Sequence, residues 1–200
     1  RSYSVTGVQT CALPILPDSE ADNPLGEYSG AGTIFGATGG VMEAALRTAY
    51  KLATGKELPD PKIDFVRGGK GIKKGKIEIL GKEVRIGVAS GLGNVSKLMN
   101  EIRDAKAKGQ EPPYHFVEVM ACTGGCVGGG GQPYRSTTRI RLARAKGLYK
   151  EDELCQRRES HNNQSIQKLY QEFLGKPNSD KARKLLHTSY LARPIVISKK

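Results

Sequence analysis

Long apolar runs are what this 200-residue sequence most clearly lacks. No stretch approaches the roughly 20 apolar residues that a membrane-spanning helix needs, and the start lacks the charged, apolar and small-residue order of a secretory signal. Cysteine is also scarce, since the 4 Cys stand at irregular positions, which argues against a disulfide scaffold and favours a reducing compartment. We therefore expect a cytoplasmic protein with no membrane partner.

Acidic residues are too few to balance the basic ones, and the formal net charge is +12. Such a charge indicates nucleic-acid binding when Lys and Arg gather in one patch. Here they are spread along the chain among acidic residues, and a solvated helical face explains the densest run, Arg139 to Gly147. We therefore expect no nucleic-acid partner. A nucleic-acid binder would instead show salt-sensitive binding to DNA or RNA without any metal.

The first fifteen residues match no natural structural element. Val5 to Ile15, "VTGVQTCALPI", resembles the conceptual translation of a common sequencing adapter, which would make Cys11 an artefact. The alternative is a genuine disordered N-terminal arm. Under either interpretation residues 1–15 are expected to be disordered and to carry no function. Under the first, native sequence upstream of Leu16 is missing here.

Residues 16–147 alternate between helical and strand patterns, which predicts an α/β layer arrangement with a short mixed or parallel sheet flanked by helices. A helix is expected to start after the N-cap Thr38 and to stop at Gly55. A second helix is expected at 94–108. Strands are expected at 63–68, 76–80, 83–90 and 114–121, the middle two joined as a hairpin.

Residues 148–200 have a different character. Helical patterns at 160–174 and 179–187 are separated by Gly175 and Pro177. They contain no paired carboxylates, no Ser-His-Asp grouping and no metal-ligand spacing. We expect a helical tail that wraps around the main layer as a second domain.

Two cysteines and a run of glycines stand together in the segment "FVEVMACTGGCVGGGGQPY". Cys122 and Cys126 follow a strand, and their spacing would place both thiolates on one face of a helical turn. Thiolates bind iron directly, and peptide N–H groups can hydrogen-bond to the sulfurs of a cluster. Glycine lets the backbone approach such a bulky group because it has no Cβ. The motif predicts an iron-sulfur site with cofactor-binding glycines at Gly124, Gly125, Gly128 and Gly129.

A phosphate loop, a disulfide, a plain turn and a zinc site fit the motif less well. A phosphate-binding loop would end in Lys followed by Ser or Thr, and "GGGGQPY" does not. A disulfide between such close cysteines would be strained, and a plain turn would not need so many glycines. Zinc would need a further Cys or His pair at the usual spacing.

The ligand count leaves the predicted site incomplete. A cubane cluster takes about four protein thiolates, whereas the sequence without Cys11 offers Cys122, Cys126 and Cys155. Cys155 lies in the charged stretch "DELCQRRES", which is typical of a solvated helical thiol. The other ligands are expected from missing sequence or from another chain.

The cysteine motif resembles the last cluster-binding motif of the iron-only (FeFe) hydrogenases. The segment "GEYSGAGTIFGATGGVMEAALRTAY" resembles a conserved loop and helix of that family, and residues 160–190 resemble its small-subunit-like tail. The resemblance implies one lobe of a two-lobed domain around the H-cluster, a 4Fe-4S cubane joined to a diiron unit that carries CO, cyanide and a bridging dithiolate. Departures are mild: "ESHNNQ" replaces a more acidic run, and Arg183 stands where His is frequent.

Carried over by position, the resemblance implies that Cys122 ligates the cubane and that Cys126 bridges it to the diiron unit. Met120 and Phe35 would line the diiron pocket, although such residues at the ends of apolar stretches are more often plain core. The implied reaction is reversible cleavage of dihydrogen. The implied partners are the missing N-terminal part of the protein, ferredoxin or a nicotinamide-linked electron carrier, and hydrogenase maturation proteins.

A second function stays open, because hydrogenase-like proteins that assemble clusters or sense hydrogen share the two-cysteine motif. The segment "GATGGVMEAALR" favours the catalytic members over the assembly relatives but does not exclude a sensor. Upstream sequence would separate them, since a catalytic protein should carry a proton-relay cysteine and an acidic path there.

Overall fold

The centre of the fold is a three-stranded mixed sheet. A computed structural model of the chain describes residues 26 and 28–191, so the expectation for residues 1–15 lies outside the described residues. The strand order is β1 (Ile72–Ile79), β2 (Lys82–Ser90) and β3 (Phe116–Met120). β1 pairs antiparallel with β2, and β2 pairs parallel with β3. The predicted α/β class is confirmed.

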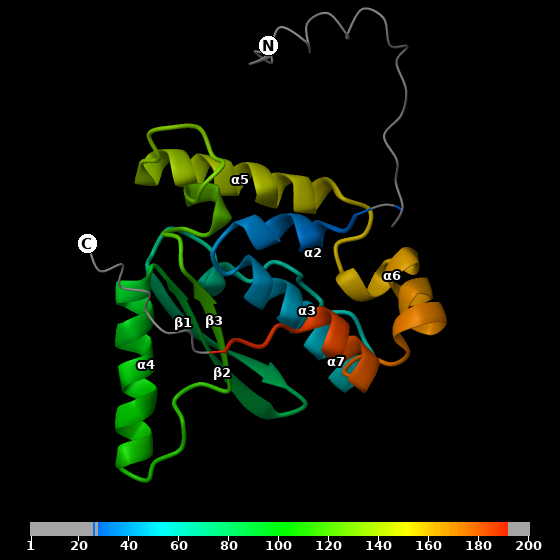
Figure 1. The fold of residues 1–200 in the computed structure, drawn as a ribbon, viewed down its shortest axis with the longest axis horizontal. Coiled ribbons are helices and arrows are strands. Elements are labelled where there is room, and N and C mark those ends of the chain that lie inside the picture. The colour runs from blue at the N-terminus through cyan, green and yellow to red at the C-terminus, as the bar shows by residue number, and fades with distance from the viewer. Residues whose placement is uncertain (1–25, 27, 192–200) are drawn as a thin grey trace, which may run out of the picture.

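Helices surround this sheet (Figure 1). α4 lies at one end of the molecule and α6 at the other, while α2 packs beside α5. The helical elements are α2 (Gly30–Thr33), η1 (Ile34–Gly36), α3 (Gly40–Thr54), η2 (Asp64–Val66), α4 (Leu92–Ala107), η3 (Cys126–Gly128), α5 (Thr138–Leu154), η4 (Ser160–Asn162), α6 (Gln164–Leu169), η5 (Tyr170–Leu174) and α7 (Asp180–Leu186).

β2 is the most deeply buried strand because helices cover both of its faces. Its residues 86–90 are all buried. On the α4 face, a Cβ added to Gly87 would lie 2.9 Å from Leu98 Cδ1, so the helix packs directly on the strand backbone. The α3 face carries the hydrophobic core, made of Met42, Leu46, Ile63, Val66, Ile86 and Val88.

The predicted hairpin is present, and its turn consists of Leu80 and Gly81. Both residues have positive φ, 53° and 73°, which is the turn geometry that matches the twist of paired antiparallel strands. The predicted strand at 63–68 is wrong, because this segment forms the short 3₁₀ helix η2. Ile63 and Val66 are both buried, and their spacing of three residues suits one 3₁₀ turn better than a strand.

The tail contains shorter helices than the sequence patterns predict. The expected helix at 160–174 is divided into η4, α6 and the π-helix η5. Asn163 causes the first break, because its side chain accepts hydrogen bonds from the backbone N–H groups of Ser165 and Ile166 and so begins a new helix. The expected helix at 179–187 is present as α7, capped by Ser179.

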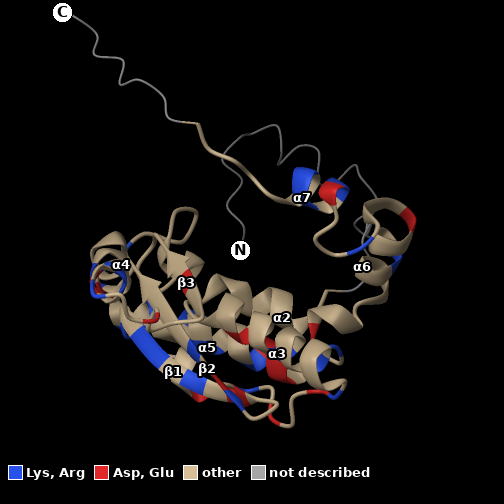
Figure 2. Ribbon diagram, turned by 90° about the horizontal axis from the view of Figure 1, so that it is seen from below, with Lys and Arg blue, Asp and Glu red and all other residues tan. Residues whose placement is uncertain are grey.

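Buried ion pairs attach the tail to α3. The Arg47 guanidinium lies 2.6 Å from Glu43 and 2.8 Å from Asp152 of α5, and all three side chains are fully buried. Arg158 donates to the same Asp152 carboxylate at 2.7 Å. Figure 2 shows Lys and Arg on many elements, among them β1, α4 and α7, and not gathered on one element.

Candidate functional site

The two cysteines lie in a loop that directly follows β3, which we call the cysteine loop (residues 121–131). Cys122 lies in a turn and Cys126 begins η3. Between them Gly124 and Gly125 have φ of 86° and 92°, values that L side chains rarely adopt and that end any right-handed helical path. The prediction that both cysteines share one helical turn is therefore wrong, since the chain reverses between them.

Both thiols of the cysteine loop are free and exposed. The backbone next to them is bare on the outside. A Cβ added to Gly129 would lie 3.1 Å from Cys122 Sγ, and a Cβ at Gly130 or Gly131 would meet no atom within 4 Å. The loop therefore has two exposed sulfurs and, at Gly130 and Gly131, uncovered peptide groups, which suits a bulky ligand.

Gly124, Gly125 and Gly128 serve the packing of the loop itself. A Cβ at Gly128 would lie 2.3 Å from Thr123 O, and one at Gly125 would lie 2.8 Å from Gly36 O. Gly125 and Gly128 thus allow the protein backbone to approach itself, whereas a Cβ at Gly124 would lie 3.1 Å from the Arg141 side chain. Their predicted contact with a cofactor stays a prediction.

A second loop, which we call the glycine loop (residues 36–40), packs against the cysteine loop. The backbone N–H of Thr38 donates to Gly124 O at 3.0 Å. This contact brings η1, and with it Phe35, next to η3, and the Phe35 side chain is 45% exposed. Met120 is half-buried at the end of β3. The fold thus brings Phe35, Met120 and the cysteine loop to neighbouring positions.

The start of α3 differs from the prediction. Its N-cap is Gly39, with φ of 92°, and not Thr38. The free N–H groups of the first turn are taken by Glu118 of β3, whose carboxylate accepts from Gly39 N at 2.6 Å and from Met42 N at 2.7 Å. Lys73 of β1 donates to Thr38 O at 2.7 Å. The residues that fix this turn are therefore remote in sequence.

Lys73 and Glu118 were missed by the sequence reasoning, although a signal for them exists. Each is a charged residue at a core-facing position of a strand, and such a residue needs a specific buried partner. Burial lowers the pKa of Lys73 to about 8, while the nearby Glu118 carboxylate acts in the opposite direction. Lys73 therefore keeps its ammonium form at neutral pH.

α5 holds the cysteine loop from the other side. The Arg144 guanidinium donates to Val127 O at 2.9 Å and to Pro133 O at 3.3 Å. Arg141 donates to Ser136 O at 3.1 Å. The basic run at 139–147 is thus more than the solvated face that the sequence suggested, because two of its arginines bind loop carbonyls.

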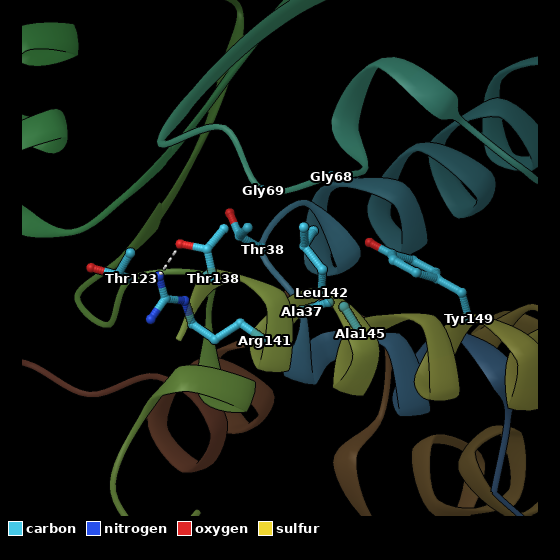
Figure 3. Close-up of a pocket in the computed structure, with 11 residues that line it drawn as sticks. Ala37, Thr38, Gly68, Gly69, Thr123, Thr138, Arg141, Leu142, Ala145 and Tyr149 are labelled. Carbon is cyan, nitrogen blue, oxygen red and sulfur yellow. Dashed lines mark hydrogen bonds between the residues drawn. The ribbon is translucent and has the colours of Figure 1, made fainter. Parts of the chain in front are cut away.

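Two hollows adjoin the cysteine loop. A hollow of about 410 Å³ lies beside Cys126, lined also by Thr33, Gly36, Gln132 and Arg144. A small cavity of about 20 Å³ lies between α5 and the two loops (Figure 3). Thr38 and Tyr149 line that cavity, and among the residues that the structure describes their buried hydroxyls have no hydrogen-bond partner.

The described part of the chain does not complete a metal site by itself. Within residues 26 and 28–191, no group of three or more His, Cys, Asp or Glu residues is placed to hold a metal ion. Cys155 lines a different pocket, with Tyr28 and Glu151. Two exposed thiols beside bare backbone fit one side of an iron-sulfur cluster, and the other side needs ligands from elsewhere.

Comparison with known proteins explains this half-site. Residues 8–130 match the family described as iron only hydrogenase large subunit, C-terminal domain, and residues 138–193 match the iron hydrogenase small subunit. The chain belongs to the iron-only hydrogenase family. The first match starts inside the segment that resembles an adapter, and the second starts where α5 begins.

Individual relatives agree with the family assignment. The chain is 49% identical over 179 residues to the NADP-reducing hydrogenase subunit HndD of Solidesulfovibrio fructosivorans. This match covers 89% of this chain and 30% of HndD. It is 32% identical over 160 residues, 78% of this chain and 32% of the relative, to a probable cytosolic Fe-S cluster assembly factor of Drosophila virilis. The chain thus spans about a third of the length of these curated relatives.

The fold agrees with a solved hydrogenase structure. A variant of the FeFe hydrogenase HydA1 from Chlamydomonas reinhardtii is 40% identical, with a TM-score of 0.63 over 92% of this chain and 54% of that chain. The sheet and its flanking helices are thus those of the C-terminal part of an iron-only hydrogenase. No helix among the described residues has the length and apolar character to cross a membrane.

Proposed function

We propose that this chain supplies one side of an H-cluster site in an enzyme that reversibly converts dihydrogen into two protons and two electrons. The observation that carries the proposal is the pair of free, exposed thiols, Cys122 and Cys126, in a loop whose backbone at Gly130 and Gly131 is uncovered. Among the described residues, the two thiols that follow β3 form no disulfide. Family membership supports an iron-sulfur cofactor as the ligand that would use them.

In this proposal Cys122 would hold a 4Fe-4S cubane, and Cys126 would hold both the cubane and a diiron unit that carries CO, cyanide and a bridging dithiolate. When bound, the cofactor supplies the metal chemistry of dihydrogen cleavage and the first electron acceptor. The remaining ligands come from an N-terminal lobe of the same protein, which the relatives' greater length supports.

The chain's own residues shape and shield the site. Phe35 is 45% exposed next to the cysteine loop, so its apolar side chain can exclude water once a second lobe covers it. Met120 occupies the end of β3, directly before the cysteine loop. Arg144 holds the loop that carries Cys126 by donating to Val127 O within the loop and to Pro133 O just after it.

The partners follow from the same assignment. Electrons would pass to ferredoxin or to a nicotinamide-linked carrier, and the name of the relative HndD, an NADP-reducing hydrogenase subunit, supports the second. Assembly of the diiron unit would need hydrogenase maturation proteins. We place the reaction in the cytoplasm.

A second candidate is a hydrogenase-like protein that binds a cluster without turning over dihydrogen. The 32% identity to a probable cluster assembly factor supports it. The 49% identity to a hydrogenase subunit favours the enzyme.

The test is a chimera in which this chain replaces the matching part of HndD, produced without oxygen together with maturation proteins. We expect bound iron, the infrared bands of metal-bound CO and cyanide, and dihydrogen turnover. Cys126→Ser should abolish the diiron bands, whereas the matched control Cys155→Ser should keep them. Bands retained in Cys126→Ser would refute the assigned bridge, and iron without turnover would favour the second candidate.

A further inference from the structure

Two buried charges flank the centre of the sheet beneath the start of α3. In the strand register Lys73 pairs with Val88, and Val88 pairs with Glu118. Paired residues point to the same face, so a lysine and a glutamate stand on either side of a valine, facing the core. They are 5% and 6% exposed. Burying two charges is costly unless specific contacts compensate for it.

Their contacts meet on a single peptide group. Lys73 Nζ donates to Thr38 O at 2.7 Å, and Glu118 Oε1 accepts from Gly39 N at 2.6 Å. Thr38 O and Gly39 N are the two polar atoms of the peptide that joins these residues, so the lysine holds one end and the glutamate the other. The second carboxylate oxygen accepts from Met42 N at 2.7 Å, which ties the peptide to the first turn of α3.

The peptide so held stands where the two loops meet. Thr38 donates its own N–H to Gly124 O of the cysteine loop. On the opposite side the backbone lies close to its neighbour, because a Cβ at Gly39 would lie 1.9 Å from Val66 O. The Thr38 N–H belongs to the preceding peptide group and shares Thr38 Cα with the held one, so a shift of Thr38 Cα would move the contact with the cysteine loop.

We propose that Lys73 and Glu118 are positioning residues that fix the Thr38–Gly39 peptide and thereby hold the glycine loop against the cysteine loop. They touch no reacting atom and act through the backbone. The consequence for the cofactor rests on the function proposed above, whereas the effect on the two loops does not.

The test measures amide hydrogen exchange, residue by residue, in the full 200-residue chain. Glu118→Gln keeps the side-chain shape and loses the charge. It should speed exchange at Gly39 and Met42 by about tenfold or more, because charge-assisted hydrogen bonds to these amides are lost. The amide of Leu98 in α4 serves as the reference for global unfolding and should change by less than about twofold.

The matched controls come from an exposed ion pair on the same hairpin. Lys76 Nζ lies 2.7 Å from Glu83, and these side chains are 71% and 47% exposed. Lys76→Met and Glu83→Gln should leave exchange at Gly39 within about twofold of the unchanged chain. Equal acceleration at Gly39 and at Leu98 in Glu118→Gln would overturn the proposal, because it would show a general loss of stability.

A second readout follows the effect into the cysteine loop. Alkylation of Cys126 by a maleimide should change at least about threefold in Glu118→Gln and in Lys73→Met, while alkylation of Cys155 should not change. Lys73→Arg keeps a charged donor, so Cys126 should be alkylated at the original rate in this variant. If Lys73→Met does not fold, the comparison is made between Lys73→Arg and Glu118→Gln. An unchanged Cys126 rate in these variants would overturn the proposal. Altered rates in a chain that never binds iron would reject the proposed function and leave the positioning role standing.

Discussion

Around α3 the fully buried charged side chains are joined to partners within the chain, whereas at the cysteine loop two thiols face outward beside bare glycine backbone. Glu43 and Asp152 both pair with Arg47 and have no exposed surface, and Arg67 and Arg158 supply the further positive charges. Among the described residues, Cys122 and Cys126 have no such partner and remain free thiols. The chain completes the first region by itself, whereas we propose that a cofactor completes the second. Substitutions near α3 should therefore alter folding, and substitutions in the cysteine loop should alter cofactor binding.

The largest effect on folding is expected from Arg47→Met. It leaves two carboxylates, Glu43 and Asp152, buried with one fewer cation, and breaking a buried pair costs about 3–5 kcal/mol. The control is Lys51→Met, one turn further along α3, where a partly exposed pair with Glu57 contributes about 0–1 kcal/mol. Urea unfolding of both variants measures the difference. Equal losses would show that the buried network does not attach the tail.

Paired glycine substitutions compare the two regions directly. Gly39→Ala should cost about 2–4 kcal/mol, because its Cβ would lie 1.9 Å from Val66 O in a backbone conformation that favours glycine. Gly130→Ala, in the cysteine loop, meets no atom within 4 Å and should change stability by less than about 0.5 kcal/mol. The free energy of unfolding measures both. A large loss for Gly130→Ala would show that the cysteine loop is packed within this chain.

Local patterns were enough to predict much of the fold. The hairpin, the α4 helix and the strand before the cysteines follow from alternation, helical spacing and glycine stops, all of which act within a few residues. Ile63 and Val66 misled the prediction because a short buried segment looks the same as a strand or as a 3₁₀ turn. Its hydrophobic residues reveal burial but not backbone shape.

The candidate site was predictable in its residue types but not in its geometry. Cys122, Cys126 and the glycines that follow them indicate a metal site by residue type alone, whatever backbone conformation they adopt. The cap of α3 was not predictable locally, because Glu118 stands 79 residues from the Gly39 amide that it accepts from. The spacing of Cys122 and Cys126 suggested a helical turn, but positive φ at Gly124 and Gly125 reverses the chain.

Acid should weaken the α3 region through Asp152. Burial alone would raise the pKa of Asp152, but hydrogen bonds and charge from Arg47 and Arg158 outweigh burial and lower it. A carboxyl with a lowered pKa stabilises the fold above its unfolded pKa of about 3.9 and loses that contribution as the pH falls further, by up to about 1.4 kcal/mol for each pH unit. Arg158→Met should raise this pKa and reduce the slope of stability below about pH 4.

The measurement is the urea midpoint between about pH 2 and pH 7. Lys62→Met is the control, because its partner Asp64 is 76% exposed and contributes little. Its pH profile should follow that of the unchanged chain. A profile for Arg158→Met that also coincides with the unchanged chain would show that Arg158 does not influence the carboxyl.

The smallest effect is expected at the cavity between the two regions (Figure 3). About 20 Å³ is enough for one water molecule, and the buried hydroxyls of Thr38 and Tyr149 line the cavity. If a water bonds to them, Tyr149→Phe and Thr38→Val should each cost about 1 kcal/mol. Tyr134→Phe, at a side chain that is 94% exposed, is the control and should be neutral. If the hydroxyls instead stand without a partner, the same two substitutions should stabilise the chain, because they remove an uncompensated buried polar group. The sign of the change in unfolding free energy therefore decides whether a buried water links the glycine loop to α5.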